Sequence, residues 1–146
     1  MVGAGQRVRD GEHRNPVNYQ ALAKFRHHIR TFFAFSETAL HNAGLKPAQY
    51  QAMLVIQASA EQGQQSTAST LASELFIQLN TAVELVDRIE ATGFAVRHRS
   101  MADRRIVYVE LTEAGRAVLA PLAALHLDHH RNNMDGLLGA MRELAA

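Results

Sequence analysis

The sequence predicts a mainly α-helical protein with a small β-wing, in the arrangement of a winged helix-turn-helix. Two short stretches in the middle of the chain have apolar residues at i, i+3, i+4 and i+7, the spacing of one helix face. Only residues 76–80 separate these stretches, which leaves room for a tight turn and little else. An alternating run follows at 107–111, preceded by arginines around an expected hairpin tip. Helix, turn, helix and basic hairpin together define the fold class.

The two helices of the motif have clear apolar faces. Thr67 is a suitable N-cap for the first helix, and Gly93 is a suitable stop for the second. The apolar face of the first helix comprises Ala68, Leu71, Ala72 and Leu75. The apolar face of the second comprises Ala82, Leu85, Val86 and Ile89. Thr81 and Glu84 at the start of the second helix fit a capping box, in which each side chain accepts from the other residue's amide.

The expected wing is the most basic part of the chain. Val107, Val109 and Leu111 alternate with polar or amphipathic residues, a period of two that indicates a strand. Between residues 94 and 111 four arginines oppose Asp103 and Glu110, which leaves a local charge of +2. Between residues 45 and 93 two cations oppose five acids, which leaves −3. We therefore expect a basic wing beside a mildly acidic helix pair.

Helices are also predicted on both sides of the motif. Residues 18–43 are predicted to form a long helix that is apolar on two faces, so it needs two partners, of which one could be the core and the other a second subunit. A shorter helix runs from about 46 to 60. Thr112 can cap a helix over 113–133, which Pro121 should bend. Asn132-Asn133 is expected to interrupt it before a last amphipathic helix at 134–144.

Composition narrows the class of protein. A chain of 146 residues with net charge +1 suggests one domain, which we place at residues 16–146 after a tail at 1–15. The absence of cysteine excludes disulfides, cysteine-based zinc sites and thiol redox sensing. No apolar run approaches the ~20 residues of a membrane span, and the N-terminus lacks the pattern of a secretory signal. A cytoplasmic protein without a membrane partner is expected.

Three fragments of the central motif occur in a fixed order: LASEL at 71–75, AVELVDRIEATGF at 82–94 and DRRIVYVELTEAGR at 103–116. Together they resemble the MarR (multiple-antibiotic-resistance regulator) family of winged helix-turn-helix transcription regulators. It extends over roughly residues 18–145. It implies a homodimer held by helices in 16–44 and 113–146, with a DNA-binding lobe at 45–112. It also implies that the second motif helix begins one turn earlier, near Gln78, so both starts remain open.

We expect the protein to bind double-stranded DNA and to act as a repressor on a pseudo-palindromic operator. Asn80 suits an adenine edge, while Glu84 either completes the capping box or accepts from a cytosine amino group. The family plan places one wing arginine in the minor groove and pairs another with an acid of the reading helix, for which we expect Asp87 with Arg105. The predicted DNA-binding residues are Gln78, Asn80, Thr81, Glu84, Arg88, Arg97, Arg99, Arg104 and Arg105.

The resemblance further implies that a small aromatic or phenolic molecule releases the DNA. Candidate ligand contacts on the helices that would line such a pocket are Phe25, His28, Phe32, Tyr50 and Met53, although ordinary core packing is the simpler explanation for each of them. No cofactor is expected.

Three other functions compete with a DNA-binding regulator. The acidic region 45–93 is compatible with an interaction module that has lost DNA binding. Histidines near the C-terminus suggest a metal sensor, because His126 and His130 are four residues apart on one helix; the remaining members of that group are Asp128 and His129, with His27, His28 and His41 on the first helix. Solvated or interface histidines are the simpler explanation, so no metal is predicted. No serine or carboxylate lies in an orienting motif, so no enzyme is expected.

Overall fold

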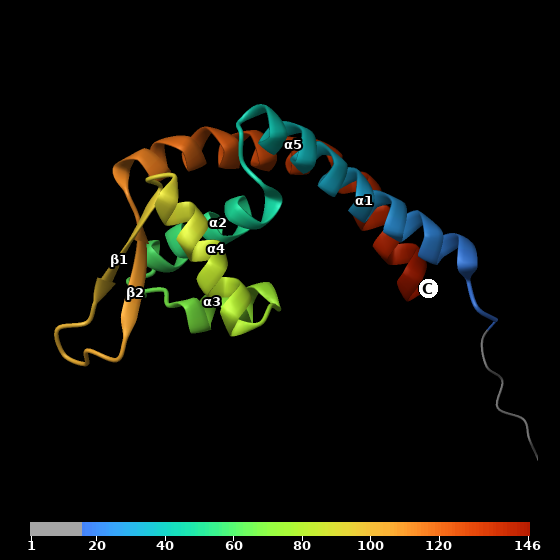
Figure 1. The fold of residues 1–146 in the computed structure, drawn as a ribbon. Coiled ribbons are helices and arrows are strands. Elements are labelled where there is room, and N and C mark those ends of the chain that lie inside the picture. The colour runs from blue at the N-terminus through green and yellow to red at the C-terminus, as the bar shows by residue number, and fades with distance from the viewer. Residues whose placement is uncertain (1–15) are drawn as a thin grey trace, which may run out of the picture.

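The computed structural model describes residues 16–146, and the predicted tail at 1–15 lies outside the described residues. Its elements in order are α1 (Tyr19–Asn42), α2 (Pro47–Glu61), α3 (Ala68–Leu75), α4 (Leu79–Ala91), β1 (Ala95–Arg99), β2 (Val107–Leu111) and α5 (Glu113–Ala145). Figure 1 shows α2, α3, α4 and the two strands gathered in one lobe. Helix α1 lies along the second half of α5, away from that lobe. The predicted winged helix-turn-helix is therefore confirmed.

The ends of the helices follow the predicted caps at two places and differ at a third. The hydroxyl of Thr67 accepts from the amide of Thr70 at 3.1 Å, and that of Thr112 accepts from the amide of Gly115 at 3.1 Å. Helix α4 instead begins at Leu79 with Gln78 as its N-cap, since the Ala82 amide already donates to the Gln78 carbonyl. The capping box of Thr81 with Glu84 is therefore wrong, because both residues lie inside the helix.

Helix α5 is longer than predicted. It runs without interruption from Glu113 to Ala145, so the expected break at Asn132-Asn133 is wrong. Asparagine is only a weak helix former rather than a helix breaker, and the side-chain amide of Asn133 donates to the His129 carbonyl one turn back. Pro121 lies within the helix, and Figure 1 shows α5 changing direction between its first half, over the lobe, and its second half, beside α1.

The core of the lobe fixes how α4 is presented. Its inward face packs Leu85, Val86 and Ile89 among residues of α2, α3, both strands and the start of α5. The strands pair antiparallel from Ala95 opposite Leu111 to Arg99 opposite Val107, and the Val109 amide also donates to the Ser66 carbonyl at 2.8 Å. With this face buried, the polar side of α4 points away from the core.

Outside the lobe, α1 and the second half of α5 expose large apolar side chains. Tyr19 is 75% exposed and Phe33 is 66% exposed. Further exposed apolar residues on these two helices are Leu22, Leu125, Leu127, Met134, Leu138, Met141 and Leu144. Within residues 16–146, no helix has the length and apolarity needed to span a membrane.

Candidate nucleic-acid interface

The outward side of α4 carries the polar residues predicted to read DNA. Asn80, Thr81, Glu84 and Arg88 are all exposed, as is Gln78 just before the helix. The Asn80 side-chain oxygen accepts from the Thr81 amide at 3.0 Å, so it occupies one of the free N–H groups of the first turn. The structure therefore places these side chains on the accessible side of α4 and at its N-terminal end.

Arg97 holds the wing against α4. Its guanidinium lies 2.7 Å from the Asp87 carboxylate and 3.5 Å from that of Glu90, and it donates to the Val83 carbonyl at 3.1 Å. The Arg97 amide donates to the second Glu90 carboxylate oxygen at 2.9 Å. These contacts neutralise two acids of α4. They also commit to the protein itself an arginine that was predicted to contact DNA.

The predicted pair of Asp87 with Arg105 is therefore wrong, because Arg97 is the partner of Asp87. The reason is positional. Arg97 lies in the middle of β1, which contacts α4, whereas Arg105 lies in the connection at the far end of the hairpin. The sequence indicated that a wing arginine would pair with Asp87. It did not indicate which part of the hairpin contacts α4, and therefore which arginine is close enough.

At the tip of the wing, Arg105 is paired locally. Its Nε and Nη2 donate to the two carboxylate oxygens of Asp103, both at 3.1 Å. This side-chain bond, together with the Arg105 amide, lowers the pKa of Asp103. Arg99 donates to the Arg104 carbonyl at 2.7 Å and so braces the tip. In the described part of the chain, no ion pair or hydrogen bond involves the Arg104 side chain, which makes it the uncommitted cation of the tip.

The five predicted ligand contacts do not converge on one hollow. Met53 is fully buried in the lobe core, and Tyr50 stacks on His126. Phe32 packs edge-on against His130, and His28 lies against Gly136 of α5. Phe25 is half-buried on α1. Two of the five thus belong to the packing of the lobe, and three lie along the length of α1.

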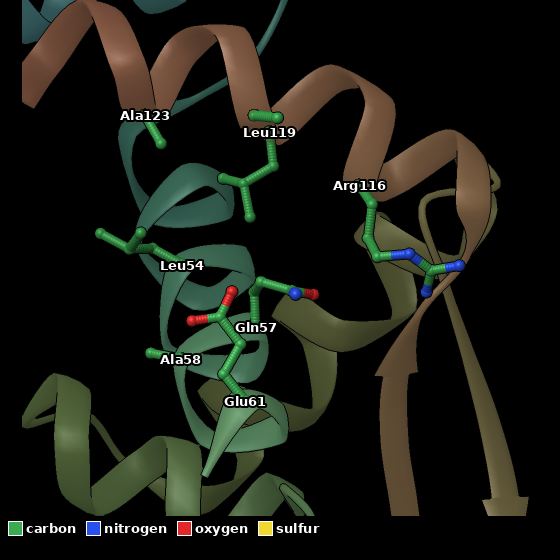
Figure 2. A pocket seen from close by; sticks show the side chains of 8 residues that line it. Leu54, Gln57, Ala58, Glu61, Arg116, Leu119 and Ala123 are labelled. Atoms are coloured by element: carbon green, nitrogen blue, oxygen red, sulfur yellow. The ribbon is translucent and has the colours of Figure 1, made fainter.

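A surface hollow of about 330 Å³ lies elsewhere, between α2 and the start of α5 (Figure 2). Its lining residues are Leu54, Gln57, Ala58, Glu61, Arg116, Leu119, Ala120 and Ala123. Arg116 turns toward the strands, where its Nη1 donates to the Leu111 carbonyl at 2.8 Å. A second hollow is lined by Glu37, Thr38, His41, Leu45, Lys46 and Pro47. Neither includes a predicted ligand contact.

The histidines of α5 pack against aromatic rings. His126 is buried; its Nδ1 donates to the Leu122 carbonyl at 2.7 Å and its Nε2 lies 2.9 Å from the Ser36 hydroxyl. His129 stacks on Phe35 with ring centroids 3.6 Å apart. Among residues 16–146, no three histidine, cysteine or acidic side chains are placed to hold a metal ion. The arrangement explains these histidines as part of the packing between α1, α2 and α5.

This packing predicts a pH dependence of stability. Burial, and then the proximity of His126 and His129, lowers the pKa of His130. Below the ordinary histidine pKa of about 6.5, the unfolded chain therefore takes up a proton that the folded chain resists, and stability falls as pH falls through this range. The urea midpoint should drop between pH 7.5 and 5.5, and it should drop less in His130→Gln. An equal drop in both proteins would contradict this assignment.

Comparison with known proteins agrees with this geometry. No family model matches the sequence. The transcriptional repressor CouR, solved bound to a 23-mer DNA duplex, is 30% identical with a TM-score of 0.65, and the match covers 85% of this chain and 90% of that CouR chain. AbsC from Streptomyces coelicolor, a MarR family transcriptional regulator, is 23% identical with a TM-score of 0.71, covering 86% and 84%.

A relative from Bacillus subtilis (strain 168), the uncharacterized HTH-type transcriptional regulator YkoM, is 24% identical over 110 residues, covering 73% of this chain and 69% of YkoM. The lobe, its exposed polar helix and its arginine wing define a winged helix-turn-helix transcription regulator. The chain belongs to the MarR family of such regulators.

Proposed function

We propose that this protein is a dimeric, ligand-responsive repressor that binds a pseudo-palindromic DNA operator. The proposal rests on the contacts of Arg97 with Asp87, Glu90 and the Val83 carbonyl, which we call the Arg97 clamp. They hold the exposed polar helix α4 and the arginine-tipped hairpin together as one unit. Such a unit places a helix in the major groove and a cation at the neighbouring minor groove. Asn80, Thr81 and Glu84 are the proposed contacts to base edges.

A dimer is supported by the exposed apolar surface of α1 and α5. Residues 16–44 and 113–146 are the proposed dimerisation helices, and residues 45–112 the DNA-binding lobe. Exposure of large side chains such as Tyr19 and Phe33 to water is unfavourable, and a second copy of the chain would cover them. Two copies related by a two-fold axis present two α4 helices, which requires half-sites about one helical turn apart.

The acidic helix pair is compatible with DNA binding once its ion pairs are considered. Of the acids on α4, Asp87 and Glu90 are paired with Arg97, so they do not face phosphate unscreened. Glu84 remains on the reading face without a capping role. The cations for the phosphates and minor groove are then Arg104 at the tip, with Arg88, Arg99 and Arg105 in support.

Regulation by a small molecule is proposed from relatives rather than from a pocket. The CouR solved with DNA is a transcriptional repressor, and the CouR of Rhodococcus jostii RHA1 has been solved bound to p-coumaroyl-CoA. An aromatic acyl thioester or a related phenolic molecule is therefore the ligand class to test, with Phe25, His28, Phe32, Tyr50 and Met53 as proposed contacts. Such a ligand would release DNA only by binding better to a dimer whose α4 helices no longer match the operator.

The direct test is to select bound duplexes from a random pool and to measure their affinity by fluorescence anisotropy at several salt concentrations. We expect a two-fold-related sequence, a stoichiometry of two chains per duplex in sedimentation, and affinity that falls steeply as salt rises. Failure to enrich any duplex, with the purified protein folded and dimeric, would favour the interaction module instead.

A further inference from the structure

Three apolar side chains lie exposed where DNA would meet the lobe. Phe76 in the α3–α4 turn is 95% exposed, Leu79 at the first position of α4 is 56% exposed, and Val83 one turn later is 39% exposed. We call these three residues the apolar ridge. Leu79 and Val83 share one side of α4, four residues apart, next to the polar reading face that begins at Asn80.

Packing of the α3–α4 turn does not depend on the Phe76 ring, because that side chain is exposed. Phe76 has a φ of +55°, a left-handed conformation that glycine adopts freely and a bulky residue rarely does. The apolar contact of the turn is already supplied by Ile77, which packs against the core. The ring of Phe76 therefore projects into solvent at a strained position without stabilising the turn.

The position of the ridge favours duplex DNA as its partner. Val83 offers its carbonyl to Arg97, so the ridge lies beside the Arg97 clamp, and Leu79 is followed directly by Asn80. In the major groove only thymine presents a methyl group, while the other base edges present hydrogen-bonding atoms that leucine or phenylalanine cannot satisfy. Asn80 beside Leu79 suits adenine in the same or a neighbouring pair.

We propose that the apolar ridge recognises thymine by contact with its C5-methyl group in the major groove, with Leu79 as the central contact and Phe76 and Val83 beside it. The inference rests on the proposed DNA-binding function and adds a base preference to it. It predicts that each half-site contains a thymine whose methyl group, rather than its hydrogen-bonding edge, sets the affinity.

The test uses the best duplex from the selection, in which each thymine is replaced one at a time by deoxyuridine, a change that removes only the methyl group. Burial of one methyl is worth about 0.8 kcal/mol, which converts to about fourfold in affinity. The wild-type dimer should lose about this factor at one or more positions in each half-site. In Leu79→Ala the same replacements should cost clearly less affinity than in the wild type, because the central contact to the methyl group is gone, and the difference isolates the pairwise contact.

Two variants serve as controls. Arg104→Ala should bind the selected duplex and its deoxyuridine form more weakly. It should keep the full loss of affinity on methyl removal, because Arg104 lies at the wing tip and not on the apolar ridge. Phe76→Gly should be at least as thermostable as the wild type, since glycine relieves the left-handed backbone, yet it should bind the thymine duplex more weakly. A less stable Phe76→Gly would assign the ring to packing and overturn its role in recognition.

The outcomes separate this inference from the function on which it rests. Tight, salt-dependent binding that is insensitive to every deoxyuridine replacement would overturn the inference and leave the repressor proposal intact. No enriched duplex would overturn both. Loss of the dimer in Leu79→Ala would show that a second copy covers the ridge, and it would overturn the inference as well.

Discussion

Arg104→Ala is expected to weaken binding of the dimer to duplex DNA by on the order of 100-fold or more. A hydrogen bond to a charged group contributes about 1.5–3 kcal/mol, and each dimer would lose one such contact per wing. The Arg104 side chain has no protein partner in residues 16–146, so its charge is available to the narrow minor groove. The loss should be similar on the selected duplex and on unrelated duplexes, because groove potential and phosphates carry little base information. Fluorescence anisotropy at one fixed salt concentration measures it.

Arg105→Ala is the matched comparison for this prediction. Its guanidinium is held by both carboxylate oxygens of Asp103, so removing it should lower the affinity less than removing Arg104. Circular dichroism should show both variants folded, since each side chain is exposed. A larger loss for Arg105→Ala would mean that the pair with Asp103 opens on DNA, and the assignment of Arg104 as the inserted residue would then be wrong.

Gly115→Ala is expected to destabilise the fold by about 3 kcal/mol or more. An added Cβ would lie 2.0 Å from the Phe94 carbonyl oxygen and 2.9 Å from its carbon, both backbone atoms that cannot move independently. The same segment is tied to α5, since the Thr112 amide donates to the Phe94 carbonyl and the Thr112 hydroxyl to that of Gly93. Overpacking of this kind costs about 1–3 kcal/mol and occasionally more. Thermal unfolding should show a fall in Tm on the order of 10 °C.

Gly139→Ala on the same helix is the control. An added Cβ there meets no atom within 4 Å in the described chain, and alanine is the better helix former by about 1 kcal/mol. We therefore expect an unchanged or slightly raised Tm. Equal destabilisation of the two variants would show that the close approach at Gly115 is not what limits stability, whereas a loss confined to the Gly139 variant would place a second copy beside it.

Elements whose cause is local could be predicted from the order of the residues. The period of the apolar residues gave α3, α4 and β2, and the hydroxyls of Thr67 and Thr112 gave two helix starts that the structure confirms. The basic hairpin and the family resemblance followed from residues close together in the chain. Each of these depends on hydrogen bonds and side-chain spacing within a few residues, which is the range over which a sequence can be read directly.

The roles of the wing arginines could not be predicted from the sequence, because they depend on how the hairpin packs against α4. Arg97, Arg104 and Arg105 are not distinguished by the sequence, but α4 passes beside the middle of β1, so Arg97 contacts α4, whereas the Arg104 side chain has no partner within residues 16–146. The same holds for Leu79, whose exposure depends on which side of α4 the core buries. Distances between residues far apart in the chain arise from packing, and packing is settled by how all the elements fit at once.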